Sequence, residues 1–312
     1  MPYGFDVIAA YALNLPFGGH EGPPTISSLK PQQIFTHSDL LVLFRAIERV
    51  SMIRVQNLTK RFGDVLAVDD ISFDVHRGEI FAFLGPNGAG KTTTIKMLTT
   101  LLKPTQGSLQ LDGLDPTVQR DEVRKRFGVV FQDPSLDQDL TAWENMEIHG
   151  VLYGVPRKER NERATTLLQL FELWERRDGL VKTFSGGMRR RLEIARGLLH
   201  TPKVLFLDEP TLGLDPQSRN QMWKHVKALN ETDQVTVFLT THYMDEADRV
   251  AHRIAVIDHG HVVAIGSSSE LKEQTKTNSL EDAFLALTGT SIRDESASAA
   301  DSMRQIARMW RK

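Results

Sequence analysis

The chain contains the stretch Gly85-Pro86-Asn87-Gly88-Ala89-Gly90-Lys91-Thr92, which matches the pattern GxxxxGK-S/T. An apolar, β-type run from Glu79 to Leu84 precedes it, and a helix-like run from Thr93 to Leu101 follows it. Glycines at these positions let backbone N–H groups turn inward around a phosphate, and the N-terminus of the following helix adds positive charge. A Gly-rich turn would explain the glycines but not the Lys91-Thr92 pair. The stretch therefore predicts a phosphate-binding loop in which Lys91 reaches the β- and γ-phosphates and Thr92 ligates Mg²⁺.

The composition limits the class of protein. A chain of 312 residues suggests one large or two modest domains, and 40% hydrophobic residues are enough for a sizeable core. The net charge of −2 gives no global basic field that would indicate nucleic acid. The absence of cysteine excludes disulfides and thiolate metal sites. No apolar run approaches the ~20 residues needed to cross a bilayer, and the N-terminus lacks a secretory signal. We expect a soluble protein, or one attached to a membrane through a partner or its surface.

The two ends differ from the middle of the chain. Residues 1–51 carry Pro and Gly clusters and then a helix-like run, Ser38 to Val50. They are either an accessory segment or an upstream extension before a biological start at Met52, and we favour the extension. Residues 290–312 form a polar tail, which is either frayed and solvated or in contact with lipid headgroups. A final short helix in this tail would place four apolar residues near one face: Met303, Ile306, Met309 and Trp310.

The middle of the chain alternates between strand-like and helix-like runs. Residues 52–84 predict several short strands with turns at 62–64 and 76–78. Residues 139–200 are rich in helix-like periodicity, and residues 203–208 and 235–240 are β runs. Residues 253–258 and 261–265 flank His259-Gly260, which predicts a hairpin. Strands that alternate with helices around a phosphate loop predict a mostly parallel α/β core, with a helical insertion and an antiparallel portion.

Two acids follow an apolar strand. Val204 to Leu207 leads into Asp208 and Glu209, and Asp208 lies 117 residues after Lys91. Asp208 at the end of the strand can hold Mg²⁺. Glu209, one residue further, is placed to polarise an attacking water as a general base. A buried strand that ends in a solvated acidic turn is the alternative, and the phosphate loop makes it the weaker one.

Three weaker signals accompany these acids. Ser185-Gly186-Gly187 precedes a helix-like run and predicts a helix N-terminus, which is a second anion site. The three arginines at 189–191 would, on their own, be a solvated face or a phosphate patch. Gln132 ends a β run and could ligate Mg²⁺ and orient water. His242 follows the 235–240 strand at the C-terminal edge of a parallel sheet, where an imidazole can reach a γ-phosphate. Taken singly, each of these residues would more often be structural.

Together, and in this order, these residues resemble the ATP-binding cassette (ABC) ATPase domain over about Ile53 to Gly266. The resemblance implies an α/β P-loop NTPase fold with a mostly parallel sheet, an antiparallel β subdomain and a helical subdomain at about residues 133–200. The ABC ATPase domain would then occupy residues 52–289. Residues 85–92 would be the Walker A loop, and Asp208 and Glu209 the Walker B pair. Gln132 would be the glutamine of the Q-loop, and His242 the switch histidine.

The resemblance also implies how ATP is bound. Phe62 falls where the family usually has a tyrosine that stacks on adenine, Ser185-Gly186-Gly187 belongs to the signature, and Leu214-Asp215 matches the D-loop. The signature usually reads LSGGQ, whereas here Phe184 and Met188 flank the intact centre. The predicted catalytic residues are Glu209, His242 and Gln132, and the predicted Mg²⁺ ligands are Thr92, Gln132 and Asp208. The predicted ATP-binding residues are Phe62, Gly85, Pro86, Asn87, Gly88, Ala89, Gly90, Lys91, Thr92, Thr93, Ser185, Gly186, Gly187 and Asp215.

The family packs two cassettes head to tail, so that each ATP lies between Walker A of one and the signature of the other. One Walker A loop and one signature in this chain imply a homodimer, unless a homologous cassette pairs with it. The resemblance implies an ATPase subunit that drives a separate membrane permease and lies in the cytoplasm, peripheral on the inner face of the cell membrane. Residues 141–146 resemble the region that meets the permease.

Finer resemblance points to the ABC-2, daunorubicin-resistance-type exporter ATPases. It rests on residues 184–188, on Thr241 to Asp248 and on Ser279 to Gly289. This favours export of drugs, lipids or other apolar compounds, with no nucleic-acid partner. The alternative is a soluble ABC ATPase that acts on ribosomes or DNA. Such relatives usually carry two cassettes in one chain or long coiled-coil insertions, and neither is present here. A P-loop kinase or GTPase outside the ABC family does not account for the signature.

Overall fold

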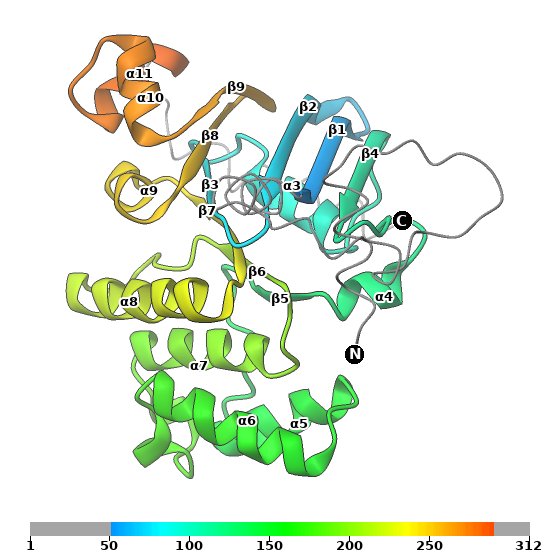
Figure 1. The fold of residues 1–312 in the computed structure, drawn as a ribbon, viewed down its shortest axis with the longest axis vertical. Coiled ribbons are helices and arrows are strands. Elements are labelled where there is room, and N and C mark those ends of the chain that lie inside the picture. The colour runs from blue at the N-terminus through cyan, green and yellow to red at the C-terminus, as the bar shows by residue number, and fades with distance from the viewer. Residues whose placement is uncertain (1–50, 290–312) are drawn as a thin grey trace, which may run out of the picture. The chain divides into compact units, whose positions relative to one another are not determined.

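The computed structural model describes residues 51–289, and all of them except Ser51 belong to a compact unit that begins at Met52. Its central sheet has six strands in the order β5-β6-β7-β3-β8-β9 (Figure 1). Neighbouring strands are parallel except β9, which is antiparallel to β8. This is the mostly parallel core that the sequence predicts. The strands are β3 (Ile80–Leu84), β5 (Phe127–Val130), β6 (Val204–Asp208), β7 (Thr236–Thr241), β8 (Arg253–Asp258) and β9 (His261–Gly266).

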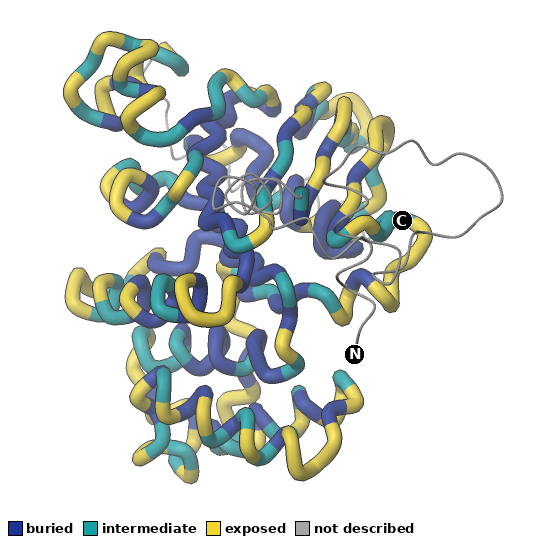
Figure 2. Tube along the Cα trace, viewed as in Figure 1, coloured by how far each residue is buried: buried dark blue, intermediate teal, exposed yellow. Residues whose placement is uncertain are grey.

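The middle strands of this sheet are covered on both faces. Every residue of β3, β6 and β7 is buried, as the dark blue centre of Figure 2 shows. Successive side chains of a strand point to opposite faces, so β3 contributes Ile80 and Leu84 to one core and Phe81 and Phe83 to the other. Continuous apolar runs are typical of parallel strands covered on both faces. The site residues at the ends of these strands are therefore attached to the best-packed part of the chain.

A second sheet has three strands in the order β2-β1-β4. They are β1 (Ser51–Phe62), β2 (Val65–His76) and β4 (Gln106–Leu111), and β1 runs antiparallel to β4. The sequence predicted several short strands over residues 52–84, but β1 and β2 have 12 residues each. No proline interrupts β1, and its pairing with β2 and β4 on both sides extends it, which explains the greater length. The predicted turns fall where expected, around Gly63 and Gly78.

The segment between β5 and β6 is helical, as its periodicity predicts. Its helices are α5 (Ala142–Leu152), α6 (Arg157–Leu170), η2 (Trp174–Arg176), η3 (Val181–Thr183) and α7 (Gly186–Leu198). Thr141 and Glu144 form a capping box at the start of α5. A Cβ atom added to Gly128 of β5 would lie 2.2 Å from the carbonyl oxygen of Gly197. Two facing glycines therefore let α7 lie directly against the sheet.

The other helices of the described residues lie outside this segment. They are α3 (Lys91–Leu98), α4 (Arg120–Arg124), α8 (Pro216–Asp233), α9 (Met244–Val250), α10 (Ser268–Thr275) and α11 (Leu280–Thr288). Helix α3 begins two residues before the predicted start at residue 93 and ends three residues before the predicted end at residue 101. The predicted hairpin is present as β8 and β9 around His259-Gly260. The expected helices at 38–50 and near Met303 lie outside the described residues.

Candidate nucleotide site

The predicted phosphate-binding loop connects β3 to α3, at the carboxyl end of the parallel strands. Gly90 precedes the helix with a φ of 105°, and a Cβ atom there would lie 2.6 Å from the carbonyl oxygen of Ala67. The backbone therefore needs glycine at this point both for its conformation and for space. Asn87 and Gly88 are exposed, whereas Ala89 and Lys91 are buried. The loop thus presents its tip to solvent and anchors its base in the core.

Lys91 extends back across the loop. Its Nζ donates to the carbonyl oxygens of Gly85 at 2.7 Å and Pro86 at 3.1 Å, and it lies 3.1 Å from Oε1 of Glu209. Both ends of this ion pair are nearly fully buried. Burial lowers the pKa of Lys91, although the Glu209 carboxylate opposes that effect. A buried ammonium held at the centre of a glycine-rich loop fits a phosphate ligand, because an anionic ligand would replace the carboxylate as its partner.

The two acids at the end of β6 have different surroundings. Asp208 is the last residue of β6, and its Oδ1 accepts from the hydroxyls of Thr92 at 3.3 Å and Thr240 at 2.5 Å. Burial raises the pKa of Asp208, and the two hydroxyls partly offset this rise. Glu209 has a φ of 46°, an unusual conformation for a residue with a side chain. The predicted pair therefore consists of one hydroxyl-bound acid beside the phosphate loop and one acid turned away from the strand.

Glu209 lies between two nitrogen groups. Its Oε2 is 3.0 Å from Nδ1 of His242, and its Oε1 faces Lys91. Burial raises the pKa of Glu209, but the hydrogen bond from His242 and the charge of Lys91 outweigh it, so the pKa lies below its ordinary value. Glu209 is therefore a carboxylate at neutral pH. The structure thus brings together Lys91, Thr92, Asp208, Glu209 and His242, which the sequence predicted for one site.

Gln132 is connected to this group through the backbone of its neighbour in the chain. Gln132 is exposed in the loop that follows β5. The carbonyl oxygens of its neighbour Phe131 and of Glu209 both accept hydrogen bonds from the guanidinium of Arg190. Phe62 ends β1 and is half-buried, with Nζ of Lys60 4.9 Å from its ring centroid. Thr93 follows Thr92 in the first turn of α3 and is half-buried.

The Ser-Gly-Gly residues are grouped with the predicted D-loop. Ser185 caps α7 and accepts a hydrogen bond from the N–H of Met188 at 3.2 Å. Asp215 caps α8 in the same way and accepts from the N–H of Ser218 at 2.9 Å. A Cβ atom added to Gly187 would lie 2.6 Å from Oγ of Ser218. Apart from Phe62 and Gln132, the predicted site residues therefore form two groups, one around the phosphate loop and one where the N-termini of α7 and α8 meet.

Three further polar residues hold the site together, and sequence reasoning did not select them. Thr240 of β7 contacts both acids, because its Oγ1 also accepts from the N–H of Glu209 at 3.0 Å. The buried Glu246 of α9 accepts from the hydroxyls of Thr211 at 2.5 Å and, more weakly, Thr241. Arg190 of α7 is buried, although the three arginines suggested a solvated face or a phosphate patch. The sequence feature that could have indicated this burial is Glu193, an acidic partner one helical turn further on.

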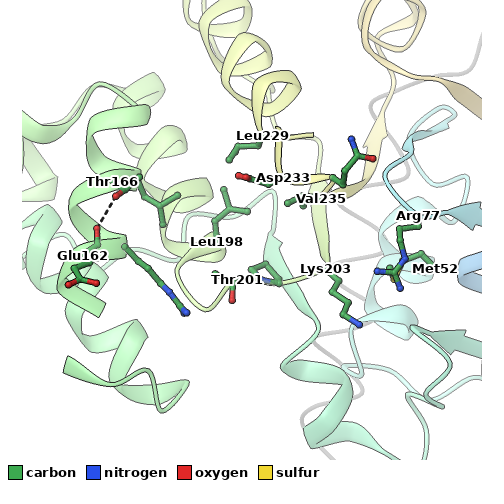
Figure 3. A pocket seen from close by; sticks show the side chains of 14 residues that line it. Met52, Arg77, Glu162, Thr166, Leu198, Thr201, Lys203, Leu229, Asp233 and Val235 are labelled. Carbon is green, nitrogen blue, oxygen red and sulfur yellow. Dashed lines mark hydrogen bonds between the residues drawn. The ribbon is translucent and has the colours of Figure 1, made fainter. Parts of the chain in front are cut away.

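A pocket of about 580 Å³ lies away from this site. Figure 3 shows its lining, which includes Lys203 and Val235, next to the starts of β6 and β7 rather than their carboxyl ends. Two of its three cationic residues, Arg77 and Lys203, pair with Asp112, and the third, Arg163, pairs with Glu159. Ligands of parallel α/β sheets bind at the carboxyl ends of the strands, so this pocket is not the predicted nucleotide site. Within residues 51–289, no helix is both long enough and apolar enough to cross a membrane.

Known proteins are similar to this chain in sequence. The family model described as ABC transporter matches residues 68–212. The daunorubicin/doxorubicin resistance ATP-binding protein DrrA of Streptomyces peucetius is 50% identical over 236 residues, which cover 76% of this chain and 69% of that protein. The Nod factor export ATP-binding protein I of Ralstonia nicotianae is 44% identical over 220 residues, or 70% of this chain and 68% of that protein. The linearmycin resistance ATP-binding protein LnrL of Bacillus subtilis is 41% identical over 220 residues, or 70% of each chain.

Solved structures agree with the sequence relatives. The ATP-binding subunit of an ABC transporter has a TM-score of 0.70 at 28% identity, over 76% of this chain and 99% of that one. A dimeric bacterial ABC transporter cassette has a TM-score of 0.63 at 31% identity, over 69% of this chain and 98% of that one. The chain belongs to the ATP-binding proteins of ABC transporters. It is an ATPase of the cassette type, and its resemblance to the daunorubicin-resistance exporter ATPases is confirmed.

Proposed function

We propose that this chain is the ATP-hydrolysing subunit of an exporter and drives a separate membrane permease. The observation that carries the proposal is the position of Glu209, an ionised carboxylate held between Lys91 and His242 beside the phosphate loop. The names of three relatives add the direction of transport, since they denote drug resistance, Nod factor export and linearmycin resistance. Drugs, lipids and similar compounds are therefore the substrate class that we assign.

Each residue of the site has a role in this proposal. Lys91 and the loop N–H groups bind the phosphates, and Phe62 stacks on adenine. Thr92, Asp208 and Gln132 would hold Mg²⁺, because hydroxyl, carboxylate and amide oxygens are ligands that this ion prefers, and the ion would supply positive charge against the phosphates. Glu209 accepts a proton from the attacking water, which its lowered pKa permits at neutral pH. His242 orients the Glu209 carboxylate through the 3.0 Å contact with Nδ1.

We propose further that two copies act together. Ser185, Gly187 and Asp215 group where the N-termini of α7 and α8 meet, whereas the acids group with the phosphate loop. A helix N-terminus can stabilise developing phosphate charge, so the signature of one copy would serve the nucleotide on Lys91 of the other. The dimeric cassette among the solved relatives supports this arrangement. ATP would close the dimer, and hydrolysis would reopen it.

The permease contact is assigned to α5. This helix follows the loop that carries Gln132, and its apolar residues Ile148, Val151 and Leu152 are exposed. Exposed apolar groups on one helix fit an interaction surface for an apolar partner element. The surface would bring the chain to the inner face of the membrane, because residues 51–289 contain no helix suited to crossing it. Closure of the dimer would then be transmitted through α5.

Two experiments test the proposal. In the first, the full chain is purified from detergent-solubilised native membranes and its companions are identified by mass spectrometry. A stoichiometric multi-spanning protein, lost when Leu152 is replaced by Asp, is the expected result. Recovery with ribosomes or DNA-associated proteins instead would overturn the transport assignment.

The second experiment replaces Glu209 by Gln. The variant should bind ATP, hydrolyse it very slowly and accumulate as a closed dimer in size-exclusion chromatography. Glutamine keeps the size of the side chain but cannot accept the proton, so near-normal turnover would exclude Glu209 as the base. Dimerisation without ATP would contradict the role given to the nucleotide.

A further inference from the structure

A buried arginine on α7 uses all of its donors. Arg190 lies five residues after Ser185, and 7% of its surface is exposed. A guanidinium has five N–H groups in a planar fork. The hydrogen bonds of Arg190 run from Nε to the Pro210 carbonyl (2.8 Å), from Nη2 to the carbonyls of Asp208 (3.0 Å) and Glu209 (3.3 Å), and from Nη1 to the Phe131 carbonyl (2.5 Å) and Oε2 of Glu193 (3.0 Å).

Three of these acceptors are consecutive carbonyls of one turn. The turn runs from Asp208 to Pro210 and contains Glu209, whose φ of 46° is costly for a residue with a side chain. A conformation of this kind persists only when its surroundings hold it in place. Lys91 and His242 contact the carboxylate of Glu209, whereas Arg190 contacts the backbone of the turn. The direction of the carboxylate therefore depends on α7.

The same helix also holds the loop of Gln132 on both sides. On the N-terminal side of Gln132, the carbonyl oxygen of Phe131 accepts a hydrogen bond from Nη1 of Arg190. Ser135, on the C-terminal side, donates its N–H to Oε1 of Glu193 at 2.7 Å. The carbonyl oxygen of Ser135 accepts from Nη1 of Arg196 at 2.8 Å. The loop and the turn of Glu209 are thus fastened to one short stretch of α7.

We propose that Arg190 is a positioning residue for ATP hydrolysis, which fixes the turn of Glu209 and the loop of Gln132 to the helix that begins at Ser185. The inference rests on the proposed role of Glu209 as the base. Contact of Ser185 with the nucleotide of a second copy would then set the general base and the Q-loop of this copy at the same time. Arg190 itself touches no reacting atom.

The consequence is a change in turnover rather than in ATP affinity. Lys91 and the phosphate loop form their contacts without Arg190. Losing the fork frees the turn of Glu209, and a displacement of about 1 Å at a reacting group costs roughly 100-fold in rate. We expect kcat to fall about 10- to 100-fold, with the dissociation constant for ATP changed less than about 3-fold.

The test must separate positioning from folding, because an unpaired Glu193 would destabilise the core. In the double variant Arg190→Met with Glu193→Gln, both charges of the buried pair are removed together, and the glutamine oxygen can still accept from the N–H of Ser135. Glu193→Gln alone keeps the Arg190 fork on the carbonyls and should retain kcat within about 3-fold. Arg190→Lys keeps the positive charge but lacks the planar fork, so it should lose kcat like the double variant.

Arg160 offers a matched control. It is also a buried arginine of the helical segment, with Nη1 3.0 Å from the Val155 carbonyl and Nη2 3.4 Å from Oε1 of Glu147. Arg160→Met should lower the thermal midpoint but keep kcat. Steady-state ATPase of the full chain at saturating ATP gives kcat, and ATP titration without Mg²⁺ gives the affinity. Thermal unfolding identifies any variant whose folded fraction is reduced.

The outcomes distinguish the positioning role of Arg190 from the role of Glu209 as the general base. Wild-type kcat in the double variant or in Arg190→Lys would show that Arg190 serves only stability. An equal loss of kcat in Arg160→Met would show that any buried arginine of this segment has the same effect. Glu209→Gln is measured in parallel: if it keeps its turnover, the base assignment itself fails. If Glu209→Gln is inactive while the Arg190 variants are normal, only the positioning role is refuted.

Discussion

Replacing Thr240 by valine tests how the fold holds the two acids. Thr240 is fully buried on β7, and its Oγ1 donates to Asp208 Oδ1 at 2.5 Å and accepts from the N–H of Glu209 at 3.0 Å. Valine keeps the shape of the side chain and removes both hydrogen bonds. The N–H of Glu209 keeps the Thr240 carbonyl at 3.1 Å, whereas Oδ1 of Asp208 is left with the weaker contact from Thr92 at 3.3 Å.

The magnitude follows from these two hydrogen bonds. A hydrogen bond to an ionised group contributes about 1.5–3 kcal/mol and a neutral one about 0.5–1.5 kcal/mol, while the added methyl group recovers about 0.8 kcal/mol. We expect the free energy of unfolding to fall by about 1–4 kcal/mol. Burial already raises the pKa of Asp208, and the Thr240 hydroxyl opposes that rise. Without the Thr240 hydroxyl the pKa of Asp208 rises further, so the Asp208 carboxylate becomes protonated at a higher pH as the solution is acidified.

The assay combines urea unfolding with ATPase activity between about pH 5 and 8 at saturating Mg²⁺. The acid limb of the activity profile should lie at higher pH in Thr240→Val than in the wild type, and at the wild-type position in Thr240→Ser, which keeps the hydroxyl. Thr236 is a matched control, because it is buried on the same strand and its Oγ1 accepts from the N–H of Gly78 at 3.0 Å, far from the acids. Thr236→Val should lose stability but keep the acid limb. A Thr240→Val protein with wild-type stability and an unshifted limb would refute the reasoning.

Three further predictions follow from other parts of the site and core. Ser185→Arg should abolish hydrolysis while ATP still binds the separate monomer, and loss of monomer binding would contradict the second-copy assignment. Gly90→Ala should weaken ATP binding at least about 5-fold, since strain of this kind costs about 1–3 kcal/mol; an unchanged titration would refute it. Burial lowers the pKa of His149 to about 3 and of His200 to about 4, so only the unfolded chain gains these protons below pH 6.5, and stability should fall as the pH drops from 6.5 to about 4. His149→Phe should reduce that slope, by at most about 1.4 kcal/mol per pH unit, and an unchanged slope in thermal unfolding would exclude His149 as the source.

The surroundings of Glu209 were predictable from the sequence only in part. An apolar strand followed by two acids predicted both the strand and the acidic site, because β runs and turn chemistry are local properties. His242 was a weak signal by itself, and only the meeting of β6 and β7 places its Nδ1 3.0 Å from Glu209. The lengths of β1 and β2 were wrong for a similar reason, since pairing with neighbouring strands extends a strand beyond its own local preference.

The burial of Arg190 could not be predicted from the sequence of its own helix. Three successive arginines are on average a solvated face, because burying a guanidinium is costly unless every donor is paired. Each residue of a helix is rotated by about 100° from the last, so one arginine of such a run can face the core while its neighbours face outward. Glu193, at i+3, was the local hint of a buried pair. The carbonyl acceptors, which make the burial possible, come from two distant loops and cannot be read from α7 itself.

Thr240 was in principle within reach of sequence reasoning. Both threonines at the end of β7 lie in a buried strand, and a buried hydroxyl needs a hydrogen-bonding partner. Successive side chains point to opposite faces, so two different partners were required, and the structure supplies Asp208 for Thr240 and Glu246 for Thr241. What the sequence lacked was the pairing of Thr240 with Asp208 across β6 and β7. Once the order of parallel strands is known, polar residues at their carboxyl ends can be assigned to one another, because these ends meet at the same edge of the sheet.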